Sequence, residues 1–359
     1  MSNEFSLPET MKALVIRSPS DGPNIETVPT PKAARGAAVV RVLSATVLHF
    51  VRDMYLGKRP ISLPMPLTIG TSAIGRIVEP GPDATKLKWG DVVFIDMILR
   101  SRDNQSDACL AGVNDGFSSG SKKLMAEGYR DWTYAEYCLA PLENLTLLNA
   151  DRLLGEPSSG GLGYKIEELN FITTALVPFS GLRDNGLKPG QTVIIAPANG
   201  PFGGAEVIAM GRDTSKLAEL RRNVPYAERL QTVPITGDMQ ADANELKKAG
   251  KIDVYLDIGP MQAHNSTQIK SFSFMGGYRE DFAIPHGLIV AKNISLHGRY
   301  MYEPKAVVEL IDMVQNGILK LGNPSGTEIV GSYPLDKWHE AWDAAVENAG
   351  VGKTVVVKP

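Results

Sequence analysis

The sequence predicts an α/β protein that combines a doubly wound parallel sheet with a separate β-rich domain. Short strand-like runs divided by Pro and Gly fill residues 11–140, which is typical of a small all-β unit. Residues 192–300 alternate continuous apolar runs, as buried parallel strands do, with helix-like segments. The last run, 354–357, breaks that alternation, and we expect it to return to the β-rich domain.

Length and composition favour an ordinary enzyme-like protein. The 359 residues suffice for two domains and a sizeable core. The net charge of −3 gives no argument for nucleic acid or an anionic membrane, and the N-terminal MSNEFSLPETMK lacks the pattern of a secretory signal. Cys109 and Cys138 form neither a disulfide framework nor a four-thiolate zinc site. We expect a cytoplasmic protein with a small-molecule substrate and without nucleic-acid or membrane partners.

The β-rich domain is expected to begin after a loose tail of ten residues. Its predicted strands cover 12–16, 39–43, 75–78, 91–95 and 134–140. Residues 100–130 are polar and glycine-rich without periodicity, which is typical of a functional lid or a mobile loop. The linker-like run 158–163, SSGGLG, marks the change of domain.

In the second domain, apolar residues on one helical face predict a helix over 165–177 that Pro178 ends, with a short helix over 182–187. The predicted strands cover 193–195, 207–210, 253–258, 272–275 and 294–296. Further helices are expected over 214–222, 307–318 and 335–345.

The turn after Val193–Ile195 predicts a dinucleotide site. Glycines just after a buried strand let main-chain N–H groups approach and hold a pyrophosphate. The candidates are Asn199, Gly200, Pro201, Phe202 and Gly203. Gly276 and Gly277 follow a later strand and are candidates for close backbone approach to the cofactor. At each place an ordinary tight turn is the alternative.

The end of the second strand favours NADP(H). NAD sites usually place an Asp or Glu there for the ribose 2′-hydroxyl. Here Gly211-Arg212 occupies the position and Lys216 follows one helical turn later, which suits a 2′-phosphate. Asp213 is expected to cap the helix that begins at Thr214. The alternative is that Arg212 and Lys216 are solvated surface charges.

The connection between these two strands is short. Only two residues separate Gly204 from Val207, whereas a parallel crossover normally needs a dozen or more, usually as a helix. The helix is reduced to a turn, or the strands pair differently, or a segment that relatives carry is missing. The segment 266–271 is also short for a crossover helix.

Seven motifs together resemble one family. They are MKALVI at 11–16, VVRVLSATVLHF at 39–50, IGTSAIGRIVEPG at 69–81, WGDVVF at 89–94, LKPGQTVIIAPANGPFGG at 187–204, VIAMGRDTSKL at 207–217 and GKTVVV at 352–357. The chain resembles the zinc-free branch of the medium-chain dehydrogenase/reductase superfamily, near quinone and enoyl reductases. The resemblance implies a GroES-like substrate domain over 1–157, completed by 318–359, and a Rossmann NADP-binding domain over 158–317. It also implies a nicotinamide cofactor in the cleft between them.

Zinc-dependent members carry a Cys and a Gly-His-Glu at positions that match Val47-Leu48 and Gly70-Thr71-Ser72 here. A catalytic zinc needs three protein ligands, and the histidines are scattered, so we predict no metal. The resemblance places Tyr55 near a cleft tyrosine of quinone reductases, with Asp53 as a neighbouring acid. Tyr55 and His49 are the catalytic candidates, with ordinary packing as the alternative for each.

Three aromatic residues, Tyr129, Trp132 and Tyr134, are candidates for an apolar substrate pocket, although we expect at least one to pack in the core. The predicted function is NADPH-dependent, zinc-free hydride transfer to an activated C=C, quinone or carbonyl of a small organic substrate. Two alternatives stay open: a non-catalytic relative with impaired cofactor binding, and a zinc-type alcohol dehydrogenase. A homodimer through the edge strand 294–300 is the expected assembly.

Overall fold

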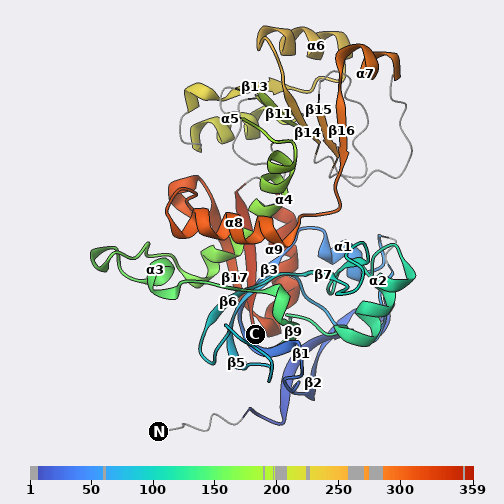
Figure 1. The fold of residues 1–359 in the computed structure, drawn as a ribbon, viewed down its shortest axis with the longest axis vertical. Coiled ribbons are helices and arrows are strands. Elements are labelled where there is room, and N and C mark those ends of the chain that lie inside the picture. The colour runs from blue at the N-terminus through green and yellow to red at the C-terminus, as the bar shows by residue number, and fades with distance from the viewer. Residues whose placement is uncertain are drawn as a thin grey trace.

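The computed structural model describes residues 7–59, 62–188, 191–196, 198, 208–223, 227–257, 271–274, 286–350 and 352–359. A parallel sheet with its helices forms one end of the molecule, and the β-rich part forms the other end, where the N-terminus lies (Figure 1). None of the described helices combines the length and apolar character that a membrane span requires.

The β-rich part contains two main sheets. The first has the order β2-β1-β4 and consists of β1 (Thr10–Ile16), β2 (Pro23–Pro29) and β4 (Leu67–Thr68). The second has the order β10-β6-β5-β3-β18-β17, with β9 also paired to β3. Its strands are β3 (Ala37–Val47), β5 (Ala73–Glu79), β6 (Val92–Ile95), β9 (Tyr137–Pro141), β10 (Leu145–Leu147), β17 (Glu328–Pro334) and β18 (Lys353–Lys358).

Strand β3 is the centre of the second sheet. It is longer than predicted because it pairs with three antiparallel partners, β5, β9 and β18. Arg41 is exposed between the buried Val40 and Val42, as expected for alternating side chains. Val355 of β18 pairs with Val47 of β3, which confirms that the closing strand returns to the β-rich part.

The parallel sheet has six described strands in the order β13-β12-β11-β14-β15-β16, and every described pair is parallel. The strands are β11 (Val193–Ala196), β12 (Ile208–Gly211), β13 (Gln231–Pro234), β14 (Val254–Asp257), β15 (Ser271–Phe274) and β16 (Ser295–Gly298). Successive residues of β11 enter different apolar clusters, so both faces of the sheet are covered. This confirms the predicted doubly wound sheet. Strand β13 is an addition that the sequence did not reveal.

The short connection joins neighbouring parallel strands. Ile194 pairs with Ile208 and Ile195 with Ala209, so the alternative in which the two strands pair differently is wrong. Within 197–207 the structure describes only Ala198, whose N–H donates to the carbonyl of Met210 at 2.8 Å. The other two explanations of the short crossover stay open.

Helix α4 (Phe171–Asp184) follows a 3₁₀ turn at Ile166–Asn170 and corrects one prediction. We expected Pro178 to end the helix, but α4 continues through this buried residue and includes residues 182–184 of the predicted second helix. Inside a helix, proline removes the N–H bond to the carbonyl four residues earlier, and its ring crowds that carbonyl. Because α4 packs against α8 (Pro304–Gln315) and also contacts β14 and β15, its burial outweighs that loss.

Residues 100–130 are more ordered than the sequence indicated. They contain part of the hairpin β7 (Ile98–Arg100) and β8 (Ala108–Leu110), then α2 (Ser119–Lys123) and a π-helical turn at Leu124–Gly128. Cys109 and Met125 are fully buried. The segment therefore contains regular elements that the sequence did not indicate, because isolated apolar residues anchor elements too short to show a period, while its role as a lid stays a prediction.

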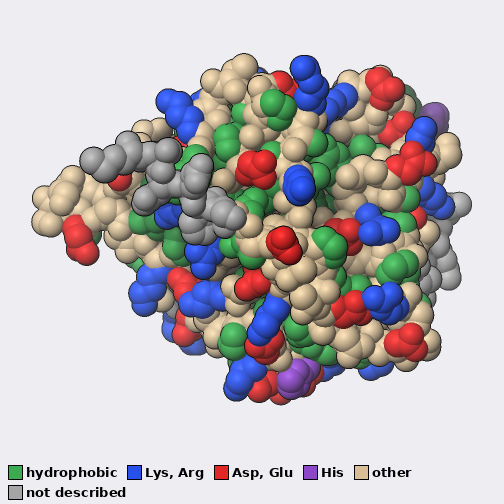
Figure 2. All heavy atoms as spheres, turned by 90° about the horizontal axis from the view of Figure 1, so that it is seen from below, with side chains coloured by type: hydrophobic (Ala, Val, Ile, Leu, Met, Phe, Trp, Pro, Cys, Tyr) green, Lys and Arg blue, Asp and Glu red, His purple; other side chains and the backbone are tan. Residues whose placement is uncertain are grey.

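The remaining helices are α1 (Val51–Tyr55), α3 (Ala150–Leu154), α5 (Thr214–Asn223), α6 (Met239–Lys248), α7 (His286–Lys292) and α9 (Trp338–Glu347). One large apolar cluster joins the β-rich sheets to α4, α8 and α9. From the end that carries β1 and β2, the surface mixes basic and acidic side chains (Figure 2). Strand β16 is an edge of the described sheet and its four residues are exposed, while the homodimer through it stays a prediction.

Candidate functional site

The end of β12 carries the predicted 2′-phosphate residues. Gly211 is the last residue of the strand, and its carbonyl accepts the N–H of Ile235 at 2.9 Å. Arg212 is exposed directly after it. One carboxylate oxygen of Asp213 accepts the N–H groups of Ser215 at 3.0 Å and of Lys216 at 3.1 Å. Asp213 therefore caps α5, as predicted, and leaves the end of the strand to the basic side chains.

Lys216 connects the parallel sheet to the β-rich part. Its ammonium group donates to the carbonyl of Ala349 at 3.3 Å, in the turn between α9 and β18. An ammonium group has three N–H donors, so two remain for other acceptors. The side chain predicted to bind a phosphate thus lies where the two parts of the molecule meet.

The other predicted cofactor residues lie outside the described part of the chain. They are Asn199, Gly200, Pro201, Phe202 and Gly203 after β11, and Gly276 and Gly277 after β15.

His49 lies beside the same turn. It lines a cavity of about 20 Å³, room for about one water molecule, together with Thr46, Val47, Leu48, Thr174, Val330, Ala345, Asn348, Ala349, Lys353, Thr354 and Val355. These residues include no carboxylate. Burial, reinforced by the positive charge of Arg59, lowers the pKa of His49 to about 4. The imidazole is therefore neutral at pH 7 and can donate one hydrogen bond and accept another. Ala349 links this cavity to Lys216.

Tyr55 is a packed residue. It is fully buried, and its hydroxyl donates to the carbonyl of Gly112, with the carbonyl of Gly70 at 3.5 Å. Its ring stacks on Trp342 with centroids 5.5 Å apart. Burial raises the pKa of Tyr55 well above its ordinary value. This geometry favours the packing alternative, because the phenolic proton is already committed to main-chain acceptors.

The positions that match zinc ligands hold no ligand chemistry. Val47 and Leu48 are apolar, and the Thr71 hydroxyl donates to the carbonyl of Thr46. The hydroxyl of Ser72 accepts the N–H of Met97 at 3.2 Å. Protein zinc sites use Cys, His, Asp or Glu side chains. Across the described ranges no three such residues gather to form a group that could hold a metal ion.

A buried polar network lies beside these positions and was missed by sequence reasoning. Asn170, at the start of α4, donates to the hydroxyl of Ser44 at 2.9 Å and accepts from that of Thr46 at 3.1 Å. Thr46 and Thr173 hydroxyls are 3.3 Å apart. The network joins β3 to α4, and because its partners are over 120 residues apart in the chain, no local pattern could reveal it.

Sequence reasoning also missed the contact between Tyr302 and Asp96, which fixes the chain where it returns to the β-rich part after β16. The hydroxyl of Tyr302 donates to Asp96 at 2.9 Å, and Arg100 donates to the Tyr302 carbonyl at 2.8 Å. Burial raises the pKa of Asp96 to about 6. An acid directly after the apolar strand VVFI is the signal that could have identified it.

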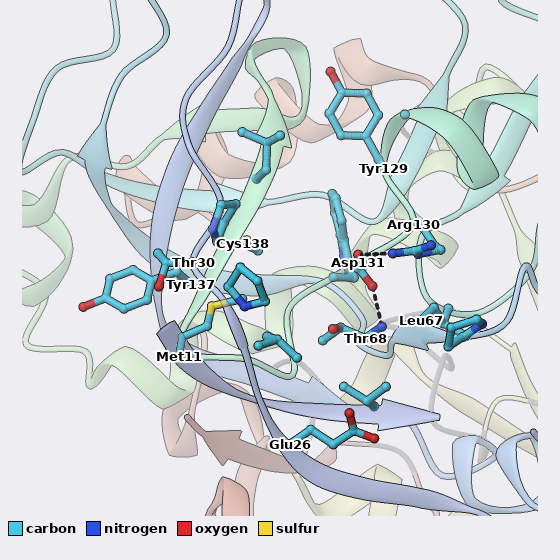
Figure 3. Close-up of a pocket in the computed structure, with 18 of the residues that line it drawn as sticks. Met11, Glu26, Thr30, Leu67, Thr68, Tyr129, Arg130, Asp131, Tyr137 and Cys138 are labelled. Atoms are coloured by element: carbon cyan, nitrogen blue, oxygen red, sulfur yellow. Dashed lines mark hydrogen bonds and ion pairs between the residues drawn. The ribbon is translucent and has the colours of Figure 1, made fainter. Parts of the chain in front are cut away.

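The three aromatic residues of the predicted substrate pocket, Tyr129, Trp132 and Tyr134, do not share one environment. Tyr134 and Trp132 are both fully buried in the apolar core, and the hydroxyl of Tyr134 donates to the carbonyl of Thr46 at 2.8 Å, so two of the three confirm the expected core packing. Tyr129 and Trp132 line a larger cavity on the β-rich part (Figure 3). That cavity shares no lining residue with the one around His49.

Comparisons with known proteins agree with this architecture. The alcohol dehydrogenase GroES-like domain matches residues 34–150. An alcohol dehydrogenase of Geobacillus stearothermophilus is 24% identical over 365 residues, which cover 96% of this chain and 99% of that protein. An acryloyl-coenzyme A reductase of Sulfurisphaera tokodaii is 23% identical over 368 residues, which cover 97% and 100%.

Solved structures share the whole fold. An alcohol dehydrogenase from E. coli, complexed with NADH, has a TM-score of 0.72 at 15% identity and covers 98% of this chain and 100% of that one. A dehydrogenase from Sinorhizobium meliloti, bound to NADP, has a TM-score of 0.67 at 18% identity with the same coverage. The shared fold combines a GroES-like part with a parallel sheet, and the neighbours named here are dehydrogenases. These similarities agree with the predicted resemblance to the medium-chain dehydrogenase/reductase superfamily of oxidoreductases.

Proposed function

We propose that this chain uses NADP(H) to reduce an activated C=C, a quinone or a carbonyl group of a small organic substrate, without a catalytic metal. The observation that carries the proposal is the basic end of β12, where Arg212 is exposed and Asp213 is committed to capping α5. The relatives named above include an alcohol dehydrogenase and an acryloyl-coenzyme A reductase, which supports the reaction types considered.

The basic side chains at the end of β12 would suit the 2′-phosphate of NADP(H). A guanidinium matches phosphate oxygens in a bidentate manner, and Arg212 is exposed where the family places the adenosine ribose. Lys216 retains two N–H donors beyond its bond to Ala349. When bound, the reduced nicotinamide would supply the hydride. NADH and NADP complexes both occur among the structural neighbours, so the neighbours do not decide between the two nucleotides. The proposed preference for NADP(H) rests on this chain's own Arg212 and Lys216.

The substrate side of the proposal relies on positioning. Holding donor and acceptor in a productive geometry can remove roughly 7–11 kcal/mol of an activation barrier. His49, neutral at pH 7, is the proposed residue that hydrogen-bonds to a water beside the substrate, because its cavity has room for about one water molecule. Tyr55 is the weaker catalytic candidate, because its hydroxyl proton is committed to the carbonyl of Gly112.

A zinc-assisted reaction is disfavoured by the side chains themselves. Thr71 and Ser72 bond to the main chain at the positions where zinc-dependent relatives carry His and Glu, and Val47 and Leu48 offer no donor atom. We therefore propose no reaction step through a metal.

A second candidate is a non-catalytic relative that has lost cofactor binding. The observation in its favour is the connection 197–207, which joins two directly paired parallel strands with few residues. Crossovers of this kind usually need a dozen or more residues. The two candidates make opposite predictions for nucleotide binding.

Fluorescence titration with NADPH and with NADH tests both candidates. We expect saturable binding that favours NADPH. Replacement of Arg212 by Ala should weaken NADPH at least about 10-fold, since a hydrogen bond to a charged group contributes about 1.5–3 kcal/mol, and should leave NADH unchanged. The matched control Arg222→Ala, at the exposed far end of α5, should change neither. Binding of neither nucleotide would support the non-catalytic relative, and tighter NADH binding would refute the phosphate argument.

A further inference from the structure

The ammonium group of Lys216 reaches from the parallel-sheet part of the molecule to the β-rich part. Lys216 is in the first turn of α5, and its side chain is half-buried. The ammonium donates to the carbonyl of Ala349 at 3.3 Å, and a Cβ atom at Gly350 would lie 4.0 Å from it. One side chain of the parallel-sheet part therefore lies against two successive residues in the turn between α9 and β18.

The turn between α9 and β18 is tied to the elements on either side of it. At the end of α9, the main-chain N–H and the side-chain amide of Asn348 both donate to the carbonyl of Ala344, at 3.0 and 2.9 Å. The first residue of β18 donates its N–H to the carbonyl of Gly350 at 3.4 Å. Because the turn is held at both ends, a change in its contact with Lys216 is transmitted to α9 and β18.

The same turn forms part of the wall of the small cavity around His49. Ala345, Asn348 and Ala349 line this cavity together with residues at the end of β3 and the start of β18. The cavity measures about 20 Å³, so a small shift of the turn changes whether a water molecule fits beside His49. The position of the turn therefore bears on the hydrogen bond that His49 is proposed to make beside the substrate.

A second partner for the ammonium group would strengthen the first contact. A lysine side chain loses rotamer freedom when it is fixed, and the partner that fixes it spares the next partner that cost. The ammonium keeps two N–H donors besides the one that it gives to Ala349. A 2′-phosphate that accepts from these donors would therefore strengthen the hold of Lys216 on the turn.

We propose that Lys216 is a positioning residue that couples the 2′-phosphate of NADP(H) to the turn between α9 and β18, and through that turn to the cavity around His49. The coupling rests on the proposed use of NADP(H). Arg212 supplies affinity for the phosphate, while Lys216 also fixes the turn. By reciprocity, a turn that is held in place favours the phosphate by the same factor. NADH has no 2′-phosphate and would bind without fixing the turn.

Hydrogen–deuterium exchange of the full chain, followed by mass spectrometry, tests the coupling without a substrate. The probes are 2′,5′-ADP and 5′-AMP, which differ only by the 2′-phosphate, each at about ten times the Kd that calorimetry gives for it. The N–H groups of Ala349 and Lys353 report on the turn, because both donate to main-chain carbonyls within or beside it. We expect 2′,5′-ADP to slow their exchange at least about threefold and 5′-AMP to leave it unchanged.

Variants separate the coupling by Lys216 from simple affinity. Lys216→Met keeps a long side chain without the ammonium group, so 2′,5′-ADP at saturation should no longer slow exchange in the turn. Lys216→Arg keeps the charge and the N–H donors and should restore part of the slowing. Arg212→Ala is the matched comparison: it should weaken binding of 2′,5′-ADP, yet the slowing should persist at saturation because Lys216 is intact.

Two measurements distinguish a failure of the coupling from a failure of the proposed function. If 2′,5′-ADP does not bind the wild-type protein, the proposed use of NADP(H) fails and the coupling fails with it. If it binds but the turn exchanges at the unliganded rate or faster, or if Lys216→Met shows the wild-type slowing, only the coupling is overturned. The wild-type comparison of the two probes needs no variant, so it decides the proposal even where a variant does not fold.

Discussion

Replacement of Tyr55 by Phe separates its two possible roles. The phenyl ring keeps the stacking on Trp342, while the hydroxyl that donates to the Gly112 carbonyl is lost. A buried acceptor left without a donor costs about 1–3 kcal/mol. For a folding unit of about 150–250 residues, each kcal/mol lowers Tm by about 2–4 °C, so we expect a drop of about 2–12 °C. Because the hydroxyl does not reach the small cavity around His49, turnover with NADPH should stay within about twofold of wild type.

Differential scanning calorimetry and steady-state kinetics on the same preparation measure both quantities. Tyr333→Phe is the matched control, since that hydroxyl makes no hydrogen bond with the described residues, and it should change neither Tm nor turnover. If turnover falls at least 100-fold while Tm is unchanged, the packing argument is refuted and Tyr55 is identified as a proton donor.

Three further predictions concern buried polar groups and the absence of a metal. Burial raises the pKa of Asp96 to about 6 from an ordinary value of 3.8, so the folded protein retains a proton that the unfolded chain loses, and the free energy of unfolding should fall as pH rises from about 4 to 6. Asp96→Asn should remove this component, and urea unfolding at both pH values in both proteins checks it; an identical pH dependence would contradict the assignment. Asn170→Ala leaves the buried hydroxyl of Ser44 without its partner, while Thr46 keeps Thr173, so the free energy of unfolding should fall by about 1–3 kcal/mol and the urea midpoint with it; an unchanged midpoint would contradict the role of the network. Metal analysis should find no stoichiometric zinc and EDTA should leave activity unchanged; one zinc per chain would restore the alcohol dehydrogenase alternative.

The candidate site was predictable only in part. The basic end of β12 and the cap at Asp213 were recognised because they depend on residues within one helical turn of each other. The orientation of Tyr55 was not recognisable, since its ring is fixed by Trp342 and its hydroxyl by Gly112, both distant in the chain. The contact between Lys216 and Ala349 likewise joins two segments that only folding brings together.

By itself the sequence determined the class of fold, because apolar runs, turn glycines and helical periodicity report local hydrogen bonding and the face that each element must bury. It also determined the return of β18 to the β-rich part, since the final run no longer follows the strand-helix rhythm. Tertiary structure alone decided that α4 runs through Pro178 and that Asp96 meets Tyr302. It also placed Tyr129 and Trp132 in a cavity apart from His49. These outcomes depend on packing and on desolvation, which sum contributions from residues far apart in the chain and leave no trace in any short stretch of it.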